Sequence, residues 1–174
     1  MPTATATEES IRKKHLPRST PMKGKREGGQ ANVYETKKEV IRIAEGELGE
    51  EFAEIQKRIR EDDVDPEGER FVEVTRFGEE RGYSWQVMKK LKPYPKSHVF
   101  TPKQKRYIRE SILLLYINDI MGHGDIKSDN VMFTRNRKNQ PILIDIDTVL
   151  IDKDTKEHVI NDNIKLDLDE IDKL

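Results

Sequence analysis

The chain has 174 residues, of which 37% are charged and 34% hydrophobic, and its net charge is −1. This length and composition fit one domain with a modest core. The balanced charge gives no reason to expect nucleic acid or an anionic membrane as a partner, and the absence of cysteine excludes disulfides and thiolate zinc sites. No apolar run is long enough to span a bilayer and no signal-peptide pattern opens the chain. We therefore expect a cytoplasmic protein, and a monomer.

Residues 1–27 have the composition of a disordered tail. They contain seven Lys/Arg, three Glu, three Pro and few large apolar residues, so they should not bury enough surface to offset their ordering entropy. Beyond Gly28, alternating residues predict a hairpin of strands 32–36 and 39–44. Apolar residues at helical spacing predict a helix over 46–60. Two further strands are expected over 71–77 and 84–91.

Residues 92–100 are predicted to be a linker, after which Thr101-Pro102 predicts the start of a helix. This helix should run to about Met121. Short apolar strands follow at 131–133 and 142–144 around a polar turn, 135–140, and the acidic segment 152–174 has only scattered aliphatic residues. The order predicts an α+β fold with two lobes. The long helix is expected to face inward with Ile108, Ile112, Leu113, Tyr116, Ile117 and Ile120.

Four polar residues that suit phosphoryl transfer lie in the second half of the chain. Asp125, Lys127 and Asn130 follow the long predicted helix in one loop, and Asp145 follows an apolar segment. An Asp can orient an acceptor hydroxyl and take its proton, and a nearby Lys can reach the terminal phosphate. An amide oxygen and a second carboxylate are hard ligands for Mg²⁺. The intervening hairpin should bring Asn130 and Asp145 to one side.

This loop, His-Gly-Asp-Ile-Lys-Ser-Asp-Asn over residues 123–130, resembles the protein-kinase catalytic loop His-Arg-Asp-x-Lys-x-x-Asn. Asp145 is similar to the Asp of the Asp-Phe-Gly motif. The resemblance implies transfer from ATP with Mg²⁺, and the Lys is typical of Ser/Thr protein kinases. Gly124 replaces the family's Arg, which implies activity without phosphorylation of an activation loop. The implied catalytic residues are Asp125, Lys127, Asn130 and Asp145, and the implied metal ligands are Asn130, Asp145 and Asp147.

The first half of the chain resembles the nucleotide-binding half of a kinase less closely. Residues 27–34 are similar to the Gly-rich phosphate loop, although an ordinary Gly-Gly turn is an alternative. Arg42 stands where the family has Lys, and its planar guanidinium is an imperfect substitute. Glu51 could be the acidic partner of Arg42 or a solvated helix residue, and Met88 could line the adenine pocket or belong to the core. The implied nucleotide-binding residues are Gly28, Gly29, Gln30, Ala31, Val33, Val40, Arg42, Glu51, Met88 and Lys90.

The resemblance implies a minimal two-lobed kinase domain over 28–174. Its N-lobe would span 28–91 as an antiparallel sheet with one helix, its hinge 89–92, and its truncated helical C-lobe 93–174. Such a domain is similar to the minimal effector kinases that bacteria secrete into host cells, where some act with a host chaperone or ubiquitin-pathway enzyme. An intracellular or phage-encoded kinase fits equally well. The alternatives are a pseudokinase or binding module, and a small-molecule kinase or atypical ATPase, which the His-Gly-Asp form suggests.

Overall fold

The computed structural model describes residues 5–22, 31–61, 64–134, 140–146 and 148–174. Contacts divide the chain into two compact units. The first comprises Met1–Gly49 and Glu73–Lys90, and the second comprises Glu50–Val72 and Leu91–Leu174. The boundary after Lys90 lies within the expected hinge. The first unit differs from the expected N-lobe, because it includes the N-terminal segment and lacks residues 50–72.

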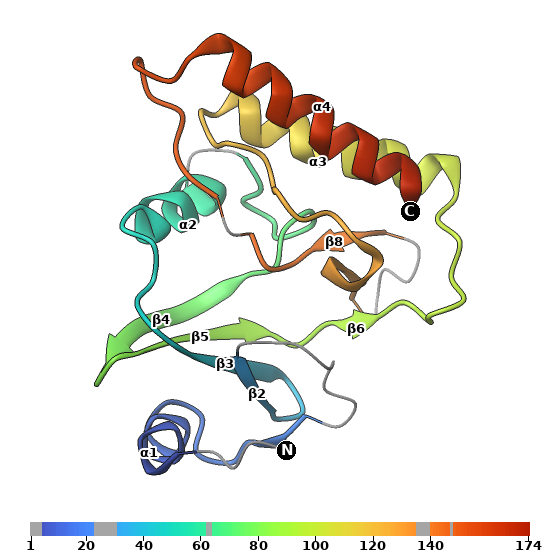
Figure 1. Ribbon diagram of the computed structural model, residues 1–174. Helices are drawn as coiled ribbons and strands as arrows, with labels where there is room; N and C mark the ends of the chain where they lie inside the picture. Colours follow the sequence, from blue (N-terminus) through green and yellow to red (C-terminus); the bar gives the residue numbers. More distant parts are fainter. Residues whose placement is uncertain (1–4, 23–30, 62–63, 135–139, 147) are drawn as a thin grey trace. The chain divides into compact units, whose positions relative to one another are not determined.

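An antiparallel five-stranded sheet forms the first unit (Figure 1). The predicted hairpin of the second and third strands is confirmed, and Thr36 closes its turn, since its hydroxyl accepts from the amides of Lys38 and Glu39. The strand order is β1-β2-β3-β5-β4. The strands are β1 Thr20–Pro21, β2 Ala31–Glu35, β3 Glu39–Glu45, β4 Val74–Glu80 and β5 Tyr83–Lys89.

Strand β4 begins later than the predicted 71–77. Phe71 forms a parallel bridge with Leu143, and the amide of Val72 donates to the Leu143 carbonyl at 2.9 Å. Phe71 is fully buried in the core of the second unit. The chain therefore passes from the second unit to the first just before β4, after the Phe71 side chain has packed into the core of the second unit.

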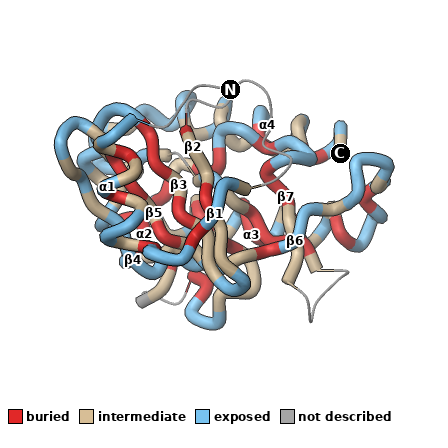
Figure 2. Tube along the Cα trace, turned by 90° about the horizontal axis from the view of Figure 1, so that it is seen from below, coloured by how far each residue is buried: buried red, intermediate tan, exposed pale blue. Residues whose placement is uncertain are grey.

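The N-terminal segment is not the disordered tail that its composition predicted, because helix α1 spans Ala6–His15. Thr5 and Glu8 form a reciprocal capping box at its start. Ile11 and Leu16 are buried against the sheet. Figure 2 shows the buried positions continuing into β3 and β5. The average composition of the segment did not reveal the helix, because these two apolar residues stabilise it only by docking on the sheet.

The core of the first unit consists of Ile11, Leu16, Tyr34, Ile41, Ile43, Trp85 and Val87.

Helix α2 spans Phe52–Glu61 and belongs to the second unit, so the predicted helix over 46–60 started too early. Gly46 has a φ of 97°, a left-handed conformation that an α-helix does not contain. Ile55 and Ile59, two of the apolar residues whose helical spacing predicted this helix, are nearly fully buried.

Helix α3, Pro102–Ile117, confirms the predicted helix start. The Thr101 hydroxyl accepts from the Gln104 amide, and the Gln104 side chain accepts from the Thr101 amide. The predicted inward face was partly wrong. Leu115 is fully buried, whereas 41% of Leu113 and 75% of Ile117 are exposed. The buried residues Ile108, Ile112 and Leu115 follow the spacing of four and three that keeps side chains on one helical face.

A small three-stranded sheet and a last helix complete the second unit. The sheet order is β6-β7-β8, with β6 Lys92–Pro93, β7 Val131–Phe133 and β8 Ile142–Leu143. A single 3-10 turn, η1, precedes β7 at Ser128–Asn130. The predicted hairpin of β7 and β8 is confirmed, while residues 135–139 of its predicted turn, 135–140, lie outside the described residues.

Helix α4, Glu157–Lys173, was not predicted for the acidic C-terminal segment. It lies beside α3 (Figure 1). Ile171 is fully buried, and the Lys105 ammonium donates to the Asp172 carbonyl at 2.9 Å. Sequence periodicity missed this helix because its buried face includes a carboxylate, Asp167, which is 1% exposed. No helix in the described ranges is both long and apolar enough to cross a membrane.

Candidate active site

The candidate loop 123–130 alternates between buried anchors and exposed polar residues. His123 is fully buried and Ile126 is 4% exposed, whereas Asp125 and Lys127 are each 55% exposed at their side chains. The buried pair fixes the loop to the core of the second unit. The exposed pair is thereby presented to solvent on either side of Ile126.

Asp125, Lys127 and Asn130 are joined by hydrogen bonds. Oδ2 of Asp125 accepts from Lys127 Nζ at 2.6 Å and from Asn130 Nδ2 at 3.0 Å, and the same Nδ2 donates to the Asp125 carbonyl at 2.9 Å. The Lys127 hydrogen bond, together with the positive charge, lowers the pKa of Asp125. Reciprocally, Asp125 raises the pKa of Lys127. The pair is therefore a carboxylate beside an ammonium at neutral pH.

Asp145 lies beside this group because of the β7–β8 hairpin. The amide of Ile144 donates to the carbonyl of Asn130 at 3.0 Å, and Nε2 of His123 donates to the carbonyl of Ile144 at 2.8 Å. The next residue, Asp145, has a φ of 59° and is close enough for its charge to raise the pKa of Lys127. The structure thus places four of the predicted site residues together in the second unit: Asp125, Lys127, Asn130 and Asp145.

Helix α4 supplies a residue that the sequence interpretation missed. The carboxylate of Asp167 accepts from the amide of His123 at 3.2 Å, the amide of Gly124 at 3.0 Å and the hydroxyl of Tyr116 at 2.9 Å. Burial is the main cause that raises the pKa of Tyr116, and the charge of Asp167 adds to it. Two backbone donors and a phenol satisfy the buried charge. Nothing in the local sequence marks this contact, because residue 167 is distant from the loop along the chain.

The donor chemistry of the site fits Mg²⁺. Since Nδ2 of Asn130 is used by Asp125, its Oδ1 is the atom that could ligate a cation, together with the Asp145 carboxylate. Mg²⁺ usually takes one or two protein oxygens and completes its shell with water and phosphate. Asp147, the third predicted ligand, lies outside the described residues. In the part of the chain that the structure describes, no cluster of three His, Cys, Asp or Glu forms a protein-only metal site.

Several predicted nucleotide-binding residues lie on one face of the first unit's sheet. Val33 is opposite Arg42, and Val40 is opposite Met88, so the four side chains share the face that does not carry the Ile41–Trp85 core. Ala31 is paired with Ala44 at the end of the same row. Gly28, Gly29 and Gln30 lie outside the described residues. Binding of a nucleotide by this face remains a prediction.

The two remaining predicted residues have other partners. Lys90 forms an ion pair with Glu35 at 2.7 Å and donates to the Thr36 carbonyl. Glu51 precedes α2, and its carboxylate accepts from the amide of Leu150 at 2.7 Å. Pairing of Glu51 with Arg42 also remains a prediction.

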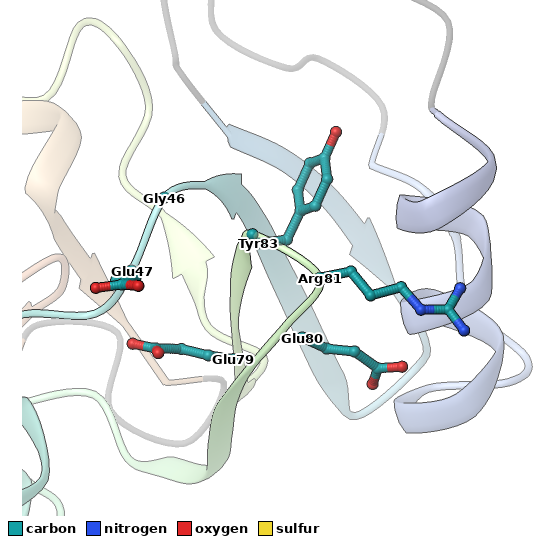
Figure 3. Close-up of a pocket in the computed structure, with 7 residues that line it drawn as sticks. Gly46, Glu47, Glu79, Glu80, Arg81 and Tyr83 are labelled. Atoms are coloured by element: carbon teal, nitrogen blue, oxygen red, sulfur yellow. The ribbon is translucent and has the colours of Figure 1, made fainter.

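A hollow of about 220 Å³ in the first unit is separate from these residues. Figure 3 shows Glu47 and Glu79 facing one another there, while Arg81 extends away from them. Glu79 accepts from the Leu48 amide at 2.7 Å, and Glu80 pairs with Lys14 at 2.8 Å. None of the predicted site residues lines it, so the candidate active site is the loop in the second unit.

Comparison with known proteins gives a match only at the level of structure. No family model matches the chain, and no curated protein matches its sequence. A solved kinase, PK-1 of Cydia pomonella granulovirus, is similar with a TM-score of 0.57 and 16% identity, over 88% of this chain and 60% of that chain. WbdD is similar with a TM-score of 0.52 and 15% identity, over 86% and 44%. WbdD bound to the kinase inhibitor LY294002 gives 0.51 and 14%, over 84% and 44%. The chain therefore spans 60% or less of the length of these neighbours.

Proposed function

We propose that this chain transfers the terminal phosphoryl group of ATP to a hydroxyl group. The proposal starts from its protein-kinase-like fold. The similarity to solved kinases confirms the fold that the sequence predicted. The single observation that carries the proposed activity is the hydrogen-bonded group Asp125, Lys127 and Asn130, with Asp145 beside it. Phosphoryl transfer requires mainly positioning and charge, which such a group can supply.

In the proposed reaction, the acceptor oxygen bonds to the γ-phosphorus while the bond from phosphorus to the β–γ bridging oxygen breaks. ADP leaves, and the hydroxyl proton passes to Asp125. Since Lys127 lowers the pKa of Asp125, this carboxylate is a weak base, and orienting the hydroxyl is its main contribution. Lys127 remains cationic and can balance charge on the transferring group. Mg²⁺, when bound by Asn130 and Asp145, would supply further positive charge at the phosphate oxygens.

We further propose that the acceptor is a Ser or Thr of a protein, because Lys127 follows Asp125 at the spacing typical of Ser/Thr protein kinases. Action as a secreted effector on a host protein, such as a chaperone or ubiquitin-pathway enzyme, is part of the same proposal. It rests on the resemblance of the sequence to minimal effector kinases.

The test is incubation of the purified chain with γ-labelled ATP, Mg²⁺ and a protein mixture. We expect the wild type to label protein, and we expect the rate of labelling to be about a hundredfold or more lower in Asp125→Asn and in Asp145→Asn. Asp162→Asn is the control, because Asp162 is an exposed α4 residue that loses the same charge. Labelling that persists in both site variants would refute the assignment.

Phosphate release and thermal stability, measured on the same purified chain, separate the competing functions. Release of phosphate without labelled protein would indicate a small-molecule kinase or ATPase. Thermal stabilisation by Mg·ATP without turnover would indicate a nucleotide-binding module.

Phosphatase treatment should leave activity intact, because Gly124 cannot bind a phosphorylated activation segment as an Arg does.

A further inference from the structure

A second α4 carboxylate lies against the candidate loop. Oε2 of Glu170 accepts from the amide of Ile126 at 2.8 Å. Glu170 is half-buried and is three residues beyond Asp167, so both carboxylates lie on one helical face. Ile126 is the buried residue between the two exposed polar residues of the loop. The bond therefore reaches the backbone between Asp125 and Lys127.

The peptide group that receives this bond is held from both sides. Its N–H, from Ile126, donates to Glu170, and its C=O, from Asp125, accepts from Asn130 Nδ2 at 2.9 Å. This peptide bond is trans, so its N–H and C=O point in opposite directions within one plane. Fixing the N–H on Glu170 therefore fixes the direction of the carbonyl that holds the Asn130 amide.

The orientation of Asn130 follows from this arrangement. Its Nδ2 bridges the carbonyl and the Oδ2 of Asp125, so the rigid amide group turns its Oδ1 to the other side. If the Asp125–Ile126 peptide rotated, the carbonyl would leave Nδ2, and the Asn130 amide would lose one of the two bonds that orient it. Because the Asn130 side chain is nearly fully buried, few other partners could replace that bond.

We infer that Glu170 is a positioning residue that clamps the Asp125–Ile126 peptide and thereby orients Asp125 and the Asn130 amide for phosphoryl transfer. The inference rests on the proposed function. It assigns to α4 a second contact with the loop, at the reactive pair itself, whereas Asp167 holds His123 and Gly124.

Two substitutions separate the length of the side chain from its charge. Glu170→Gln keeps an acceptor oxygen at the same reach but loses the charge. Glu170→Asp keeps the charge but is shorter by one C–C bond, about 1.5 Å, so it no longer reaches the amide at hydrogen-bond distance. Asp169→Asn is the matched control, since Asp169 is the exposed neighbour on the same helix.

The experiment measures kcat, KM for ATP and the Mg²⁺ concentration for half-maximal activity in each variant. We expect Glu170→Asp to lower kcat about tenfold and raise the Mg²⁺ requirement, because a small displacement of reacting groups is costly. Glu170→Gln should stay within about threefold of the wild type, since a neutral acceptor is only moderately weaker, and Asp169→Asn should match the wild type. Equal activity of the Gln and Asp variants, or wild-type kcat in Glu170→Asp, would overturn the inference.

A second readout requires no turnover. Hydrogen exchange of the Ile126 amide, measured by NMR on the chain without nucleotide, should be faster in Glu170→Asp than in Glu170→Gln and in Asp169→Asn. Equal exchange in the three variants would overturn the clamp. If the wild type transfers no phosphoryl group but the exchange pattern is as expected, the proposed function fails and the clamp stands.

Discussion

Gly122, which precedes the candidate loop, has no room for a side chain. A Cβ at this position would overlap both the Tyr116 hydroxyl and a carboxylate oxygen of Asp167. The residue also has a φ of 52°, which L side chains rarely adopt. Gly122 therefore lets the buried Asp167 approach the backbone of the loop.

We predict that Gly122→Ala lowers the free energy of unfolding by about 3 kcal/mol, because it adds a steric overlap to a strained φ. Gly82→Ala is the control. Gly82 has a φ of 78° but open space around its Cβ, so it should lose only about 1 kcal/mol. Urea unfolding of both variants provides the measurement. A similar loss in the two variants would show that the conformation alone matters and that the close approach to Asp167 does not.

In helix α3, the packing of the second unit decides which apolar side chains are buried. Its residues 108–117 are rich in Ile and Leu, so several rotations of the apolar face fit the sequence. Packing selects one of them, in which Leu115 is fully buried and Ile117 is 75% exposed. The choice can be tested with two neighbouring residues of one helix.

We expect Leu115→Ala to lower the free energy of unfolding by about 2–5 kcal/mol, because it leaves a cavity in the core of the second unit. Ile117→Ala should change it by less than about 0.5 kcal/mol, since its side chain is already largely in water. Thermal or urea unfolding followed by circular dichroism measures both. The opposite order would mean that the apolar face predicted from the sequence, with Ile117 inward, was correct.

At the scale of the whole molecule, each unit has a core of its own, and the N-terminal segment completes the first. His15 at the end of α1 stacks on Trp85 with ring centroids 3.7 Å apart. Burial lowers the pKa of His15, and the charges of Lys14 and Arg76 act in the same direction, whereas Glu80 opposes them. The folded state therefore favours neutral His15.

This lowered pKa predicts a pH-dependent stability of the first unit. A group whose pKa is lower in the folded state contributes its full stability above its unfolded pKa of about 6.5 and loses it as the pH falls below that value. We expect the midpoint of unfolding to decrease as the pH is lowered from about 7.5 to about 5.5. It should fall less in His15→Phe, which keeps a stacked ring without a titrating group.

Trp85 is the sole tryptophan, so its fluorescence reports on the first unit. Lys13→Ala is the control, since this side chain is 69% exposed on the same helix and should retain the wild-type pH dependence. An identical pH dependence in His15→Phe and the wild type would contradict the assignment to His15.

The sequence by itself determined the elements whose signals are local. The Thr101-Pro102 start of α3, the alternation in the β2–β3 hairpin and the two short strands β7 and β8 each depend on neighbouring residues, and each was predicted. The spacing of Asp125, Lys127 and Asn130 in one loop likewise required no tertiary information. It is a local motif, and its placement beside Asp145 followed from the intervening hairpin.

Only the tertiary structure decided the features that depend on distant partners. Helix α1 forms because Ile11 and Leu16 dock on a sheet built later in the chain. Helix α4 directs Asp167 and Glu170 to a loop more than 40 residues earlier. The pattern of the sequence shows neither of the two carboxylate contacts, because Asp and Glu are the same residue types whether they are buried or solvated. The burial that distinguishes them arises when the chain folds, since a desolvated charge is stable only where donors from other elements meet it.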